Sequence, residues 1–373
     1  MEVSAIKKKR KNPAKQQFRI ETGYNTLIIT DKELVCKKCK SPFFLIRPKV
    51  GNFRESLSFL QTITQFGKSH SDSATADILR NKYGKKKFCN SMYVKRKIDV
   101  IGKIVKEFHA EEHLKKQCLF AKTGGAKELI CVMDGTYIHH WHKKKKNFAV
   151  IALKVFNPEN MIEISKNRTV ILKSRCSGVL GTNNKFLVKE LMRCLLSEGW
   201  NYETKVYFCA DGEEKLWKTG KEKICNSTGI LDWFHITKRL TEIFLWQTAE
   251  LKLLWQKAKE NLWKGNVDNA LNILDNIKIF DNAKIQKKID KFIQYLENNR
   301  EYIIDYNSNQ DNDLPISSAI AESLIEQLVS PRLKKKQKMQ WSKSSAENVL
   351  QIRSCYLNKE DNLFWDYYIE NAA

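Results

Sequence analysis

Two stretches of the sequence decide the fold class, Leu129-Ile130-Cys131-Val132-Met133-Asp134-Gly135 and Val206-Tyr207-Phe208-Cys209-Ala210-Asp211-Gly212. Each is a short apolar run, typical of a buried β-strand, that stops at an Asp-Gly pair. Glycine permits a sharp backbone turn at that point, and the aspartate can project beyond the edge of a sheet. If the two strands are neighbours, both carboxylates reach one spot.

Further elements around these stretches predict a mixed α/β sheet. Residues 148–156, 169–172 and 230–234 are predicted strands, and a leucine stripe over 186–196 predicts a helix. Three strands in a row followed by helix, strand, helix and strand is the pattern of a mixed-sheet α/β core. We expect residues 126–235 to form the first part of this core.

The region before the core, residues 56–125, is predicted to be helical. Ser71 can cap its second helix, Gly84 closes that helix, and a longer basic helix starts near Asn90. Helix, basic glycine-containing turn and basic helix outline a helix-turn-helix, in which the second helix reads DNA. The residues expected to contact DNA are Lys95, Arg96 and Lys97. A plain helical bundle with a solvated charged face explains the pattern equally well.

Residues 1–55 form a basic N-terminal region with a lone Cys-x-x-Cys pair, Cys36 and Cys39. A zinc site needs four ligands, and a second pair at matching spacing is absent from the sequence. Zinc binding at this pair is therefore the less favoured interpretation. The alternative is a hairpin turn with two spectator thiols.

The C-terminal half contains a helical segment followed by a basic tail. Residues 236–314 are rich in Leu, Trp and Lys with helical spacing, and the pattern from Ile243 to Leu262 predicts one long helix. Residues 315–373 begin with a short helix carrying Glu322. The basic residues after this helix are Arg332, Lys334, Lys335, Lys336 and Lys338. We expect them to hold DNA, with a solvated charged face as the alternative.

Charge and composition restrict the partner. Against 66 Lys and Arg stand only 42 Asp and Glu, a net charge of +24, which predicts double-stranded DNA as the partner. Ten cysteines without framework spacing indicate a reducing compartment. No segment approaches the ~18 apolar residues of a membrane span. We therefore expect a cytoplasmic, nucleoid-associated protein that does not bind membranes.

Converging carboxylates predict a metal site. Two such groups repel each other unless a cation lies between them, and oxygen ligands suit Mg²⁺ or Mn²⁺. A third acid from a helix, for which Glu322 is the candidate, would complete a two-metal site for the in-line attack of water on phosphodiesters. The alternative is simple, because Asp-Gly after a strand is also ordinary turn chemistry.

Four blocks of sequence together resemble the Mutator-related transposases of bacterial insertion sequences. They are Val132-Met133-Asp134-Gly135, Cys209-Ala210-Asp211-Gly212, Leu231-Asp232-Trp233-Phe234-His235 and Ala319-Ile320-Ala321-Glu322-Ser323. The tail segments Lys338–Ser342 and Leu350–Asn358 resemble the C-terminal signature of that family. The resemblance covers about residues 128–367 and implies an RNase H-like core interrupted by an all-helical insertion, here 236–314.

The same resemblance implies roles for individual residues. Asp134, Asp211 and Glu322 match the catalytic acids; the two aspartates would bridge two metal ions and Glu322 would hold the second. Asp232 and His235 match the family's Asp-x-x-His element, which is expected to support the ligands or to pack the insertion on the sheet. Glu326, one helical turn after Glu322, is a rival third acid.

These expectations combine into a DNA transposase that cleaves the ends of its element and transfers the strands, working as a homodimer or a larger synaptic assembly. Two alternatives remain open at this point. One is a protein that only binds DNA, as a decayed or domesticated transposase would. The other is a metal-dependent nuclease without strand transfer.

Overall fold

The structure is a computed structural model of the chain. It describes residues 15–24, 26–35, 42–44, 55–84, 89–119, 125–141, 146–165, 168–244, 248–277, 283–312, 314–316, 319–334 and 340–371. The chain divides into two compact units, treated separately here. One consists of residues 1–108 and 351–373, and the other of residues 109–350. The five functional segments predicted from the sequence stay a prediction.

The first unit combines a small sheet with helices. Its antiparallel strands are β1 (Lys15–Glu21), β2 (Thr26–Val35) and β3 (Pro42–Phe44), in that order. Its helices include α2 (Leu57–Gly67), α3 (Asp72–Tyr83) and the start of α4 (Ser91–Leu119), so the described residues between 57 and 119 are mainly helical, as predicted. Ser71 caps α3 and Gly84 ends it in the left-handed conformation, as predicted. The unit also includes the end of α13 (Lys343–Leu357), from Gln351 onward, and α14 (Asp361–Asn371).

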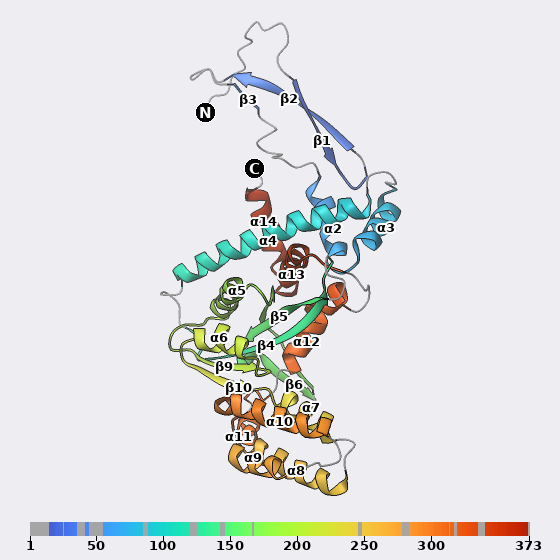
Figure 1. Ribbon diagram of the computed structural model, residues 1–373. Helices are drawn as coiled ribbons and strands as arrows, with labels where there is room; N and C mark the ends of the chain where they lie inside the picture. The colour runs from blue at the N-terminus through green and yellow to red at the C-terminus, as the bar shows by residue number, and fades with distance from the viewer. Residues whose placement is uncertain are drawn as a thin grey trace. The chain divides into compact units, whose positions relative to one another are not determined.

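The second unit is built on a five-stranded mixed sheet, so the predicted α/β core is confirmed (Figure 1). The strand order is β10-β9-β4-β5-β8. The strands are β4 (Glu128–His139), β5 (Asn147–Phe156), β8 (Arg175–Leu180), β9 (Lys205–Ala210) and β10 (Ser227–Leu231). The pairs β4·β9 and β9·β10 are parallel, whereas β4·β5 and β5·β8 are antiparallel.

The third strand of this sheet differs from the prediction. Residues 168–171 form β7 (Arg168–Ile171), which pairs with β6 (Met161–Ser165) in a separate two-stranded sheet. The third strand of the main sheet is β8, whose Ser-Gly centre lacks an apolar run. Gly178 is required there because a Cβ would lie 2.9 Å from the Leu328 side chain. The sequence of β8 thus reflects the close packing of a helix residue, Leu328, on Gly178 and not an apolar pattern.

Two predicted helix and strand boundaries were also wrong. The predicted strand 230–234 ends at Leu231, and Trp233 begins helix α7 (Trp233–Phe244). The predicted helix from 243 to 262 is divided, because α7 ends at Phe244 and α8 (Ala249–Trp263) starts with its own N-cap, Thr248. Residues 245–247, between them, lie outside the described residues.

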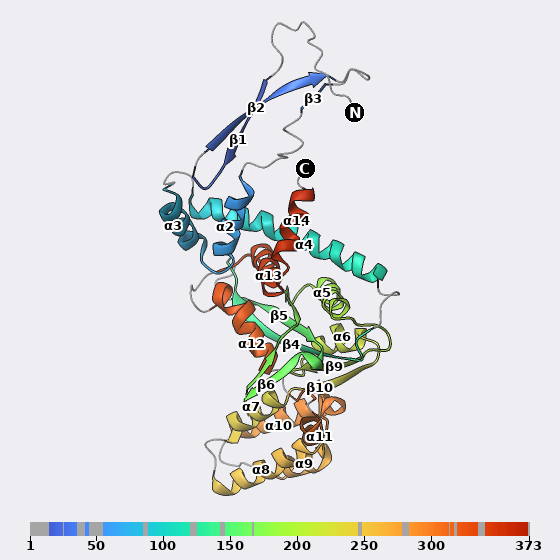
Figure 2. The ribbon, with the colours of Figure 1, turned by 180° about the vertical axis from the view of Figure 1, so that it is seen from behind.

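Helices surround the sheet and extend it. Helix α5 (Asn184–Ser197) packs against β8 and β5, and α12 (Ala319–Leu328) packs against β4 and β5. In both views α9 (Val267–Asp275), α10 (Ala283–Asn298) and α11 (Tyr306–Asp311) lie together with α8, next to α7 and β10 (Figures 1 and 2). One continuous apolar core joins these helices to the sheet. The helical segment is therefore anchored on the strands that carry the two Asp-Gly pairs.

None of the helices in the described ranges combines the length with the apolar composition that a membrane span requires.

Candidate active site

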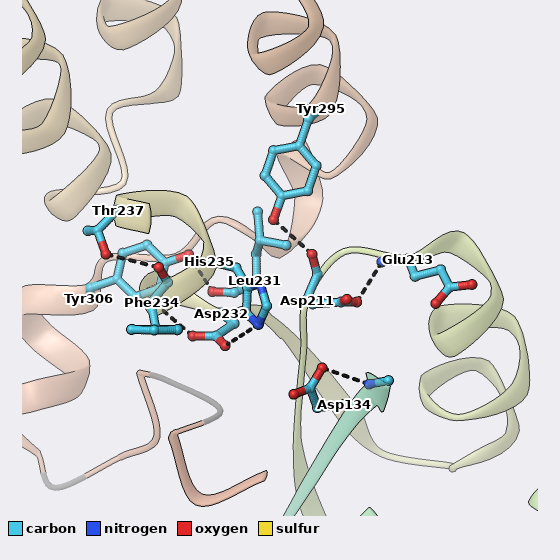
Figure 3. A network of polar contacts seen from close by, with 11 residues as sticks. Asp134, Asp211, Glu213, Leu231, Asp232, Phe234, His235, Thr237, Tyr295 and Tyr306 are labelled. Carbon is cyan, nitrogen blue, oxygen red and sulfur yellow. Dashed lines mark hydrogen bonds and ion pairs between the residues drawn. The ribbon is translucent and has the colours of Figure 1, made fainter. Parts of the chain in front are cut away.

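The two Asp-Gly aspartates lie on neighbouring strands, as predicted. The parallel pairing of β4 and β9 ends with Val132 opposite Cys209, and each aspartate lies two residues beyond that pair. Asp134 is buried, with 8% of its surface exposed, and Asp211 is half-buried. Figure 3 shows the two side chains together at this edge of the sheet.

The local geometry of the two pairs is not the same. Asp134 lies inside β4, opposite Ala152 of β5, and the strand continues through Gly135, so the predicted turn at this pair was wrong. The Gly135 amide donates to Asp134 Oδ1 at 2.6 Å. Only the second pair turns, since Gly212 has a φ of 89°. A Cβ on Gly212 would lie 2.8 Å from side-chain atoms of Leu231 and Tyr295, so this turn also excludes a side chain.

Asp134 faces the helix that carries Glu322. Directly opposed residues in a sheet share a face, and Asp134 is opposite Ala152, which is opposite Gly178. Leu328 of α12 packs on Gly178. The side chain of Asp134 therefore projects from the face that α12 covers.

The site concentrates negative charge. Burial raises the pKa of Asp134 to about 6; the charges of Asp211 and Asp232 also raise it, while the charge of His235 and the Gly135 amide lower it. Among the described residues, no lysine or arginine forms an ion pair with Asp134 or Asp211. In a chain of net charge +24, two clustered acids without such a partner need another source of positive charge.

The Asp-x-x-His element links the sheet to the insertion. Asp232 is fully buried, and its Oδ1 accepts a hydrogen bond from the Phe234 amide at 2.7 Å, which starts α7. Its Oδ2 lies 3.6 Å from His235 Nε2. Because His235 also acts on the charge of Asp134, this pair connects the helix start with the acidic site (Figure 3).

Side chains of the insertion fix the strand ends. Tyr295 of α10 donates its hydroxyl to the Asp211 carbonyl at 2.8 Å, and Tyr306 donates to the Leu231 carbonyl at 2.7 Å (Figure 3). The Arg239 guanidinium lies 4.2 Å from the centre of the Tyr295 ring. Sequence reasoning missed both tyrosines, and no local pattern marks them, because their partners are 84 and 75 residues away.

Glu213 is a further acid that sequence reasoning missed. Its amide donates to Asp211 Oδ1 at 3.0 Å. Its Oε2 lies 3.9 Å from the point where a Cβ on Gly135 would be, so the carboxylate approaches the face of β4 opposite to the Asp134 side chain. The signal in the sequence was the run Asp-Gly-Glu-Glu at 211–214, in which a second acid follows the turn directly.

Glu322 is on α12 as predicted, in the first turn, and its side chain is exposed. Among the described residues, however, the acids of this site do not bring three ligand atoms within 4.8 Å of one another. Like charges separate in a poorly solvated site, and Asp134 and Asp211 each accept a backbone amide instead. The two aspartates thus lie on adjacent strands as predicted, and the convergence of Glu322 with them stays a prediction.

The residues predicted to bind DNA or zinc differ in their surroundings. On α4, Lys95 and Arg96 are exposed, whereas Lys97 forms an ion pair with Glu55 at 2.6 Å. Arg332 is only 1% exposed and lies 4.7 Å from the Trp341 ring centre, so it cannot lie along a phosphate backbone, and that prediction is corrected. Several predicted residues lie outside the described ranges: Lys335, Lys336, Lys338, Cys36 and Cys39.

The residues present fit a divalent cation. The donors are carboxylate oxygens, which Mg²⁺ and Mn²⁺ prefer, and a cation beside Asp134 would offset the burial and the repulsion that raise its pKa. Fold and site thus define an α/β protein with a buried, acidic candidate metal site at the edge of its sheet.

Comparison with known families places the chain in a family but assigns it no activity. The chain belongs to the uncharacterised protein family UPF0236, whose model matches residues 114–363. The matched range includes the whole sheet, the helical insertion and α12. We find no match among curated proteins.

A pH-dependent cost in stability is the first prediction. The pKa of Asp134 is raised to about 6 in the folded state, above its ordinary value of 3.8. The protonated carboxyl therefore costs the folded state no stability below pH 3.8, and the folded state loses stability as the pH rises from there through 6. With chelator present, Asp134→Asn is expected to stabilise the protein at pH 7.5 by up to about 3 kcal/mol. Urea unfolding at pH 7.5 and pH 4 measures this, and an equal effect at both pH values would contradict it.

Proposed function

We propose that this protein is a DNA transposase of the RNase H-fold, three-carboxylate type, which cleaves the ends of its element and joins them to target DNA. One observation carries the proposal: Asp134 and Asp211 lie on adjacent parallel strands, close enough to influence each other's charge, with no basic ion-pair partner among the described residues. The sequence blocks that resemble those of Mutator-related transposases imply a catalytic role for the same two residues.

The architecture supports this proposal in two ways. Three antiparallel strands, β8, β5 and β4, continue into the parallel strands β9 and β10, as expected for an RNase H-like core. Between β10 and α12 the chain forms the helices α7 to α11, which correspond to the helical insertion of the proposed family. The net charge of +24 supports a phosphate-backbone partner.

The site residues would divide the work as follows. Two Mg²⁺ or Mn²⁺ ions, held by Asp134, Asp211 and Glu322, would stabilise the charge on the attacking and leaving oxygens of a phosphodiester. Tyr295 holds the Asp211 carbonyl, and Gly212 admits the turn, so the carboxylate is oriented before substrate arrives. Asp232 orients His235 beside the acids.

The function is tested by a cleavage and joining assay with the full chain. The substrate is a duplex carrying the terminal sequence that flanks the gene, with Mg²⁺ or Mn²⁺ added. Metal-dependent nicking followed by joining of the new 3′-hydroxyl end to a second DNA supports a transposase. Nicking without joining identifies a nuclease, and DNA binding without nicking identifies a protein that only binds DNA.

DNA affinity is expected to fall steeply with salt, which is the second prediction. A protein that neutralises several phosphates releases the counterions condensed on them, so log affinity falls linearly with log salt, by about 0.9 per phosphate contact. Fluorescence anisotropy with a 30-bp duplex between 50 and 300 mM NaCl measures the slope. A slope near zero would refute the phosphate-backbone account of the +24 charge.

A further inference from the structure

The strands β4 and β5 extend beyond their neighbours next to the candidate site. Pairing of β4 with β9 ends at Val132, and pairing of β5 with β8 begins at Val150, opposite Thr136. Residues 137–141 and 146–149 continue as a two-stranded projection, here called the arm. Trp341 secures it, because its amide donates to the His139 carbonyl and its carbonyl accepts the Trp141 amide, both at 2.9 Å.

One face of the arm presents exposed aromatic rings. Alternate residues of a strand share a face, so Tyr137, His139 and Trp141 point to one side, opposite the buried Ile138. Tyr137 is 63% exposed and Trp141 is 58% exposed. His139 Nδ1 lies 2.8 Å from Asn147 Oδ1 on the same face. A paired strand thus holds large rings in solvent at fixed positions, and such exposed apolar surface marks interaction sites.

The surroundings of the arm favour a polyanion. The described residues of the arm include Lys146, His139 and His140 and no acid. Lys334 donates to the Thr136 hydroxyl, and Trp341 pairs with the arm. Two exposed rings beside Lys146 and two histidines, in a chain of net charge +24, fit a nucleic acid.

We propose that the arm binds unpaired bases of single-stranded DNA. This inference rests on the proposed function and specifies its substrate, a DNA end with unpaired bases. In a duplex each base is covered by its neighbours, so exposed rings gain little there, whereas every unpaired base offers a face for stacking. Tyr137 is three residues along β4 from Asp134, on the order of 10 Å, and its side chain leaves the opposite face of the strand, so the bound bases lie across β4 from the acids.

The test compares the full chain with the variants Tyr137→Ala and Trp141→Ala. The matched control is Tyr202→Ala, which removes another tyrosine of the same unit, 69% exposed and far along the chain from the arm. Anisotropy is measured with a 20-nucleotide poly-dT strand and with a 20-bp duplex. Each arm variant is expected to lose about tenfold in affinity for the single strand and less than twofold for the duplex, with Tyr137→Phe close to wild type. The control should bind both DNAs as the wild type does.

The outcomes separate this inference from the proposed function. If the wild type binds neither DNA, both fail. If it binds DNA and the arm variants bind the single strand normally, or lose equally on both DNAs, the arm proposal alone is overturned. A variant that binds the single strand normally but sediments as a smaller oligomer identifies the arm as a contact between copies, which also overturns it. Circular dichroism checks that each variant is folded.

Discussion

Replacing Asp134 or Asp211 by asparagine is expected to abolish cleavage and strand joining while DNA binding persists. Losing a residue that merely supports a metal ligand costs about 10- to 100-fold in metal affinity or activity. Replacing a carboxylate that is itself the ligand should cost at least that much, so we expect the cleavage rate to fall by more than about 100-fold. Asparagine keeps the shape of the side chain and its oxygen for the Gly135 or Glu213 amide, so the fold should survive.

The measurement is nicking of supercoiled plasmid with Mg²⁺, together with duplex affinity by anisotropy. Glu214→Gln is the matched control, because Glu214 is an exposed acid three residues after Asp211 whose partner is Lys218. It should cleave like the wild type. Retention of more than a tenth of the wild-type rate in either aspartate variant would remove that residue from the catalytic site. Loss of DNA affinity in step with cleavage would point to misfolding instead.

Much of the core could be predicted because its signals are local. The runs Leu129–Met133 and Val206–Ala210 are almost wholly apolar, which fits strands buried on both faces, and both form strands in the structure. Their adjacency was a hypothesis that the sheet confirms. What the pattern could not give is the length of β4. Asp-Gly normally ends a strand, but here β5 pairs with both residues and keeps the chain extended.

Features that depend on distant contacts could not be predicted. Gly178 interrupts the apolar pattern of β8 because Leu328, 150 residues later, occupies the space of its side chain. The polar support of Asp211 comes from Tyr295, whose own helix reads only as an amphipathic surface helix. The sequence placed Asp232 in a predicted strand and in the Asp-x-x-His motif. Its role at the start of α7 follows only from the hydrogen bond that its side chain accepts from the Phe234 amide. In each case tertiary contacts override the local signal.

The helix α12 offers two glutamates as the third acid, and the structure distinguishes them. Glu326 is engaged locally, because its Oε1 accepts the Ser330 hydroxyl at 3.1 Å where the helix changes to a π-turn. Glu322 lies one turn earlier, nearer to Ile316, whose carbonyl accepts the Trp233 amide at 3.0 Å. That bond ties the approach to α12 to the residue after Asp232. Glu322 is thus at the end of α12 that lies nearer to the acidic site.

Glu322→Gln is therefore expected to reduce cleavage by more than about 100-fold, like the aspartate variants, whereas Glu326→Gln should stay close to wild type. If Glu322 and Asp134 hold the same ions, their losses are not additive, and the double variant Asp134→Asn with Glu322→Gln should be no slower than the slower single variant. Titration calorimetry with Mn²⁺ gives a readout independent of cleavage, and Asp134→Asn and Glu322→Gln should each bind Mn²⁺ more weakly.

The reverse result, an inactive Glu326→Gln and an active Glu322→Gln, would assign the third acid to Glu326. If both variants are active, the helix supplies no ligand, and Glu213, whose amide donates to Asp211 Oδ1, becomes the residue to replace next.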